Sequence, residues 1–178
     1  MSTVLTSTQY NELLSKGKGA KMFIWPVPKG AAPDHFVLVS QHQDASFVLT
    51  FLGDYQANPT GANPYMVLTA FTELIDTKGI CLIRGDLISH LSEDEGQTIM
   101  EKLLNSYLRD SEYETIRKFN QEPDKFDYEE YIKQSLAEFA QLKKHIIENK
   151  PEKINLGEYK KHGHKTDKEL NITKGGII

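Results

Sequence analysis

The stretch YMVLTAFTELIDTKGICLIRGD, residues 65 to 86, decides the fold. It holds two short apolar runs, Met66 to Phe71 and Ile80 to Ile83, which are rich in aliphatic residues and end at turn or polar residues. Runs of this length are typical of strands. Few residues separate them, so we expect antiparallel pairing, because a parallel crossover needs a dozen or more residues.

Three further strands are predicted upstream. The segment Lys21 to Val27 is one of them. Pro26 and Pro28 indicate that it lies at an edge of the sheet or ends there, because proline cannot donate to a ladder. His35 to Gln43 and Ser46 to Leu52 are expected to form a hairpin. The hairpin is apolar on both sides, which predicts cover on both faces of the sheet.

The second half of the chain has helical patterns. Ser92 is followed three residues later by Glu95, a capping box that starts one helix. A second helix is predicted from Glu112 to Phe119, and a third from Asp127 to Glu148, where apolar residues recur at spacings of three and four. Strands first and helices later predict the α+β class, a largely antiparallel or mixed β-sheet from the N-terminal half packed against C-terminal helices.

Composition divides the chain into three parts. Residues 1 to 20 are predicted to be a flexible N-terminal segment, with one candidate helix from Thr8 to Ser15 that two following glycines end. Residues 21 to 149 are expected to form a single α+β domain. Residues 150 to 178 are polar and lack periodicity, which indicates a basic polar tail.

The charge distribution bears on the kind of partner. Residues 1 to 142 hold 12 Lys and Arg against 20 Asp and Glu, a net charge of −8, whereas residues 143 to 178 hold 9 against 5, a net charge of +4. An acidic body argues against nucleic acid as the partner, because phosphate neutralisation needs a basic surface. A nucleic-acid module that uses the basic tail remains one alternative.

Other features of the sequence exclude several classes of protein. The single cysteine, Cys81, rules out an internal disulfide framework, and its apolar neighbours predict a buried structural thiol. No apolar run approaches the roughly 20 residues of a membrane span, so no membrane association is expected. The N-terminal residues lack arginine and include Glu12, which makes them a poor transit peptide.

No motif in the sequence predicts a catalytic residue, a metal site or a cofactor. Among the six histidines only His162 and His164 are close, and they lack the third ligand that a metal site needs. No nucleophile elbow is present. The other alternative therefore remains a small-molecule enzyme whose active site lies in loops at the ends of the strands and is not visible as a motif.

Large aromatic residues near prolines and polar residues are the candidates for a binding surface. Aromatic side chains concentrate at protein interfaces, although they also dominate cores, and for each residue alone the core is the better explanation. As a group, they predict a contact patch for a partner protein, made of Phe23, Trp25, Phe119, Phe126 and Tyr128.

Three stretches together carry a resemblance to a known family: the opening stretch, FIWPVPK at 23 to 29 and FNQEPDKFDYEEYI at 119 to 132. With these, the chain resembles the mitochondrial F1-ATPase assembly chaperone family, whose client is the beta subunit of ATP synthase. The resemblance implies a chaperone, not an enzyme, that prevents aggregation of the unassembled beta subunit until the alpha subunit replaces it. It further implies a matrix protein without its targeting segment, without a cofactor, and monomeric when free.

Overall fold

A computed structural model describes residues 1 to 30 and 34 to 149. In chain order its elements are β1 (Ser2–Thr6), α1 (Ser7–Gly19), β2 (Met22–Pro28), β3 (His35–Gln43), β4 (Ser46–Phe51), α2 (Leu52–Ala57), β5 (Pro64–Phe71), α3 (Ile75–Lys78), β6 (Ile80–Leu87), α4 (Glu93–Leu108), α5 (Asp110–Gln121), the 3-10 turn η1 (Pro123–Lys125) and α6 (Tyr128–Glu148). The predicted tail from residue 150 lies outside the described residues.

The strands form one antiparallel sheet in the order β1-β6-β5-β4-β3-β2. The five strands from β2 to β6 follow the chain as a meander, and β1 joins on the far side of β6. The α+β class and the antiparallel pairing are therefore confirmed. Of the two outcomes that the prolines allow, the edge position is confirmed, since β2 continues to Pro28 and, among the described residues, has a neighbouring strand on one side only.

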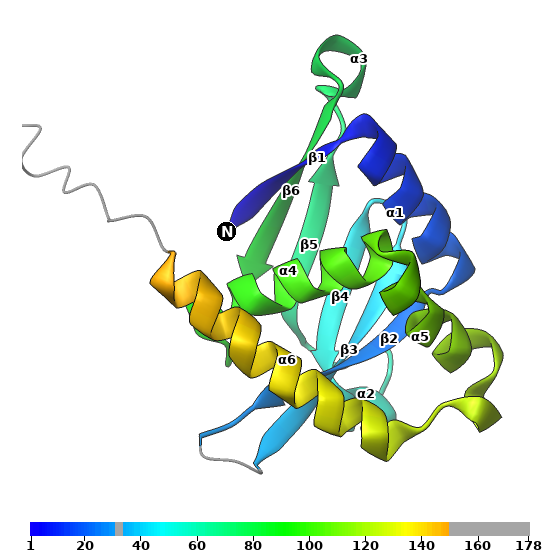
Figure 1. Ribbon diagram of the computed structural model, residues 1–178, viewed down its shortest axis with the longest axis vertical. Coiled ribbons are helices and arrows are strands. Elements are labelled where there is room, and N and C mark those ends of the chain that lie inside the picture. Colours follow the sequence, from blue (N-terminus) through cyan, green and yellow to red (C-terminus); the bar gives the residue numbers. More distant parts are fainter. Residues whose placement is uncertain (31–33, 150–178) are drawn as a thin grey trace, which may run out of the picture.

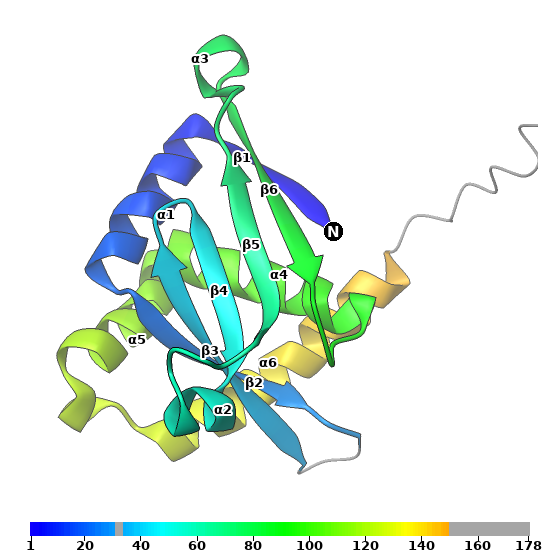
Figure 2. The same ribbon diagram turned by 180° about the vertical axis from the view of Figure 1, so that it is seen from behind.

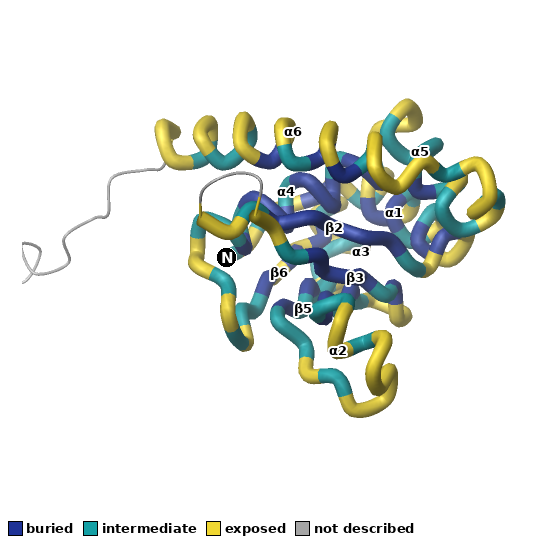
Figure 3. Tube along the Cα trace, turned by 90° about the horizontal axis from the view of Figure 1, so that it is seen from below, coloured by how far each residue is buried: buried dark blue, intermediate teal, exposed yellow. Residues whose placement is uncertain are grey.

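The helices lie mainly on one face of the sheet. Helices α1, α4, α5 and α6 cover this face, with α4 nearest to the middle strands (Figure 1). The view from behind shows the strands directly (Figure 2), and the view from below shows the helix layer on one side and α2 on the other (Figure 3). Cover on this second face is local, since α2 lies by β3 and β4, where Gln41 donates a 2.9 Å hydrogen bond to the Tyr55 hydroxyl. The cover predicted on both faces is therefore confirmed only at the hairpin of β3 and β4, where α2 packs.

The N-terminal residues correct a second expectation. Instead of a flexible segment, residues 1 to 20 form β1 and α1, which carries the chain across the sheet from one edge to the other. Thr6 caps the helix, and the Gln9 side chain bonds back to the Thr6 backbone as a capping box. The helix does not end at Gly17, because this residue is buried, and packing compensates for the low helix propensity of glycine.

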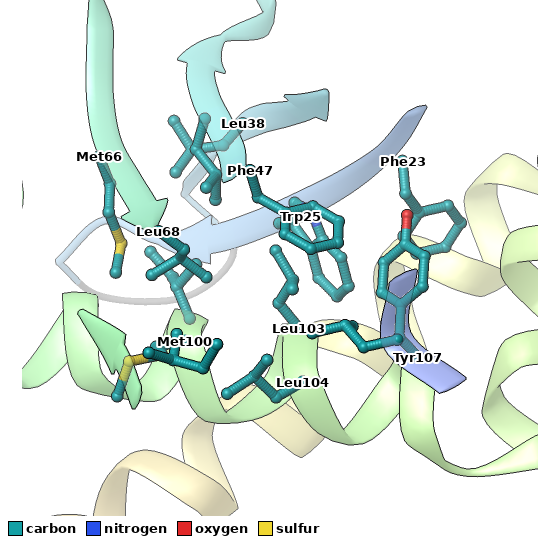
Figure 4. Packing of buried hydrophobic residues seen from close by; sticks show 14 of the residues in the cluster. Phe23, Trp25, Leu38, Phe47, Met66, Leu68, Met100, Leu103, Leu104 and Tyr107 are labelled. Carbon is teal, nitrogen blue, oxygen red and sulfur yellow. The ribbon is translucent and has the colours of Figure 1, made fainter. Parts of the chain in front are cut away.

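The core fills the space between α4 and the sheet (Figure 4). Met100, Leu103, Leu104 and Tyr107 of α4 meet a layer of strand residues, all buried: Phe23, Trp25, Leu38, Phe47, Met66 and Leu68. The polar atoms in this layer have partners. The Tyr107 hydroxyl donates to the Ala20 carbonyl at 2.9 Å, and the Trp25 indole donates to the Ser40 hydroxyl at 2.8 Å.

Local signals in the sequence are confirmed. Ser92 and Glu95 form the predicted capping box at the start of α4. At the start of α6, the Asp127 side chain accepts a 3.0 Å hydrogen bond from the backbone N–H of Glu130. Cys81 is fully buried, as its neighbours predicted, and burial raises the pKa of its thiol.

Candidate protein-binding surface

The structure brings four of the five predicted contact residues together where β2, α5 and the start of α6 meet. The Phe23 ring centroid lies 5.1 Å from that of Trp25, 5.4 Å from that of Phe119 and 6.2 Å from that of Phe126. All three pairs meet edge to face, an arrangement that aromatic rings favour. Only 1% of Phe23 and 2% of Trp25 is exposed, so these two residues belong to the core and offer no surface to a partner.

The other three predicted residues keep some access to solvent. Phe119 and Phe126 are half-buried with their centroids 5.1 Å apart, and Tyr128 is 45% exposed at the first residue of α6. The aromatic patch is thereby reduced to Tyr128 and the accessible parts of two phenylalanines. Its role in binding stays a prediction.

A second apolar surface lies on the open face of the sheet, and sequence reasoning missed it. Val4 of β1, Leu82 of β6 and Phe71 of β5 stand opposite one another in adjacent strands, so their side chains share one face. Val4 is 54% and Leu82 38% exposed, and all three residues line one shallow groove. We call these three residues the open row.

The open row was missed because β1 was not recognised as a strand. Once residues 2 to 6 pair with β6, the two-residue period of strands sends Val4 outward and Leu5 into the core. Beside the row, the Arg84 guanidinium lies 5.1 Å from the centroid of Phe71 and bonds to Asp86 at 2.9 Å. The groove thus has an apolar floor and a polar border.

Polar side chains elsewhere have structural partners. A hollow between α4, α5 and α6 contains Lys102, which pairs with Glu138, and Ser106, which donates to Glu112 at 2.9 Å. Within residues 1 to 30 and 34 to 149, no buried side-chain nitrogen or oxygen lacks a hydrogen-bond partner. No cluster of three or more potential metal ligands occurs in the same ranges. His162 and His164 lie outside them.

Large contiguous apolar patches on a folded domain mark sites of contact with other proteins, ligands or membranes. A family model, described as ATP11 protein, matches residues 1 to 132 of the 178. The chain therefore belongs to the ATP11 family, the F1-ATPase assembly chaperones. The resemblance of the three sequence stretches is confirmed.

Family membership determines the general role. The ATP11 family is a mitochondrial family of ATP synthase F1 assembly factors, which are chaperones and not enzymes. A search among curated proteins finds no match to this chain. No helix in the described part of the chain has the length and apolar character that a membrane span requires.

Proposed function

We propose that the protein binds the unassembled beta subunit of F1-ATPase in the mitochondrial matrix and prevents its aggregation until the alpha subunit replaces it. The observation that carries this proposal is membership in the assembly-factor family, over residues 1 to 132. The open row supports it, since Val4 and Leu82 offer exposed apolar side chains for contact with a client.

Protection of an unassembled beta subunit from aggregation requires no covalent chemistry. An isolated beta subunit exposes apolar surface that is meant for its alpha neighbour, and such surface drives aggregation. A folded protein that covers it excludes water and wrong partners. Release comes from competition with the alpha subunit, so the affinity is moderate and complex lifetimes are set by dissociation. No nucleotide or other cofactor is required, and the free chaperone is a monomer.

Charge contributes to the choice of partner. Residues 1 to 142 carry a net charge of −8, from 12 basic and 20 acidic residues. A charged body steers encounter and disfavours wrong partners more effectively than it adds affinity. Raising the salt concentration is therefore expected to slow association more than it speeds dissociation.

The test of this function is direct mixing. The purified chain is combined with isolated beta subunit and, separately, with isolated alpha subunit, without nucleotide, and each mixture is run on gel filtration. We expect a complex with the beta subunit only, and we expect added alpha subunit to dissociate that complex. A folded chain that forms no complex with either subunit at micromolar concentration would overturn the proposal.

A pair of variants tests the aromatic patch. Tyr128→Ser removes an exposed ring at the start of α6, while Ile147→Ser removes a similarly exposed apolar side chain near the end of the same helix. We expect the first change to weaken binding of the beta subunit and the second to leave it unchanged. Equal affinities of both variants and the wild type would remove the patch from the interface.

A further inference from the structure

We propose that the outer edge of β1 binds an extended, apolar-patterned segment of the unassembled F1 subunit as an additional strand of the sheet. The inference rests on the proposed function and specifies how the client is recognised. Strand addition of this kind uses main-chain hydrogen bonds for affinity and adjacent side chains for selection.

The backbone of β1 has hydrogen-bonding groups that point away from the sheet. Met1 and Gly85 exchange two hydrogen bonds, of 3.1 and 2.9 Å. Bonded and non-bonded pairs alternate along an antiparallel ladder, so Thr3 and Leu5 bond to β6, whereas the N–H and C=O groups of Ser2 and Val4 point outward. Among the described residues, β6 is the only strand beside β1.

The opposite edge of the same sheet, along β2, is closed: most of its outward backbone groups are either bonded to a side chain or removed by proline. Along β2 the outward positions are 22, 24, 26 and 28, because the carbonyl of Lys21 accepts from the backbone N–H of His42 across the ladder. Prolines at positions 26 and 28 remove two outward donors. Asn120 bonds to both backbone groups of Met22, and the Tyr131 hydroxyl donates to the carbonyl at position 24 at 2.7 Å.

Within residues 1 to 30 and 34 to 149, none of these protections is present at β1. Its sequence, Ser-Thr-Val-Leu-Thr, contains no proline and no charged residue, which are the usual means by which proteins prevent pairing at an edge. Ser2, Val4 and Thr6 are exposed. No described helix or strand lies along the outer edge of β1 in Figures 1 and 2. In the part of the chain that the structure describes, one edge of the sheet is closed and the other is open.

The open row indicates the chemistry of the added segment. The backbone N–H and C=O groups of Val4 point outward from the sheet. Its side chain is the first member of the open row, which continues through Leu82 to Phe71. A strand beside β1 places every second side chain on this face, next to Val4. The segment that fits best is therefore extended, with apolar residues at alternate positions.

A second copy of this chain is the less suitable occupant. Two β1 strands would pair over five residues each, with only Ser2 and Val4 of each copy bonding outward. Stable dimers bury about 1,200 Å² or more, and a pairing this short falls well below that size. A short edge suits a client that must be released.

Val4→Pro against Val4→Ala is the matched test. Proline removes the outward N–H and leaves the bonds of Thr3 and Leu5 to β6 in place, whereas alanine keeps the N–H and shortens the side chain. We expect Val4→Pro to weaken binding of the isolated beta subunit by about tenfold or more and Val4→Ala by clearly less. Circular dichroism and thermal unfolding establish that both variants fold.

Amide hydrogen exchange of the wild type, followed by NMR, gives a readout that needs no variant. The amides of Ser2 and Val4 are expected to exchange fast in the free protein and at least about tenfold more slowly in the complex, while Thr3 and Leu5 are slow in both. If the wild type binds neither subunit, this inference is overturned together with the proposed function.

The remaining outcomes separate the inference from the proposed function. If the wild type binds the beta subunit, Val4→Pro binds equally well and the Val4 amide gains no protection, then the edge is not used and only the inference is overturned. Sedimentation of the free protein tests whether a second copy of this chain binds the edge of β1. A wild-type dimer that Val4→Pro dissociates would assign the edge to self-association and would likewise overturn the inference.

Discussion

The imidazole of His42 occupies the space in which a side chain at Gly17 would begin. A Cβ atom at position 17 would lie 2.6 Å from Cδ2 and 2.8 Å from Cγ of His42. On its other side, the imidazole meets the ring of Phe47 edge to face, with the centroids 4.8 Å apart. Glycine at this position is what allows α1 to lie close against β3.

The first prediction concerns Gly17→Ala. In an exposed helix this change stabilises by roughly 0.5 to 1 kcal/mol, but here the methyl group overlaps a ring that is packed on both sides. We expect a loss of about 1 to 3 kcal/mol in the free energy of unfolding, measured by urea denaturation. The control is the same change in a His42→Ala background, where the overlap is gone and the loss should disappear. A Gly17→Ala variant as stable as the wild type would contradict the close packing of Gly17 against His42.

The second prediction is a loss of stability in mild acid. Burial lowers the pKa of His42, Lys18 and Lys21 lower it further, and Asp44 opposes them without reversing the direction. As the pH falls below about 6.5, the unfolded chain takes up a proton before the folded one does, so the free energy of unfolding decreases. Urea titrations at pH 7.5 and 5.5 measure the decrease, and His42→Gln should reduce it.

A separate acid transition belongs to Glu95. Its carboxylate is partly buried, which opposes ionisation, but hydrogen bonds from Ser92 and the nearby Lys143 ammonium lower its pKa overall. Its contribution to stability is present above the unfolded pKa of about 4.5 and is lost as the pH falls below that value. A decrease that begins only below pH 5 in the wild type would therefore exclude His42 as its cause.

The third prediction tests the closed edge of the sheet. The Asn120 amide donates to the Met22 carbonyl at 2.6 Å and accepts from the Met22 N–H at 3.2 Å, as a neighbouring strand would. Asn120→Ala should cost about 1 to 3 kcal/mol by urea denaturation, because two backbone groups lose their partners. Asn120→Asp keeps the acceptor, loses the donor and should also destabilise.

The control for the closed edge is Gln121→Ala, at the exposed last residue of the same helix. It is expected to change stability by no more than about 0.5 kcal/mol. Light scattering during mild heating provides a second measurement. Because an uncovered edge pairs with other chains, the Asn120 variants should aggregate earlier than the control.

The fourth prediction concerns the ion pair of Lys102 and Glu138 between α4 and α6. The lysine side chain is 9% exposed and the glutamate 63%, so the buried partner is the lysine. Glu138→Ala leaves a buried ammonium without its carboxylate and should destabilise by about 1 to 3 kcal/mol. Lys102→Met removes the charge at similar volume and should be neutral or stabilising. Thermal unfolding compares both with Gln141→Ala, an exposed site on α6.

Sequence alone identified the features that depend on neighbours along the chain. Two prolines limited their strand to an edge of the sheet or an early end, because proline lacks a donor wherever it stands. Ser92 and Glu95 predicted a helix start because the capping box is closed within four residues. The antiparallel pair in residues 65 to 86 followed from the short connection between its strands.

What the sequence could not determine depends on segments that meet only in the folded chain. Position 17 requires glycine because His42, from another element, fills the space in which a side chain would begin. Phe23 and Trp25 are core residues because α5 and α6 fold over β2, which aromatic composition alone does not reveal. The open row and the open edge arise because β1 pairs with β6, about 80 residues away. The exposure of a side chain depends on which other segments pack against it. Long-range packing therefore decides which residues are buried and which surface remains for a partner.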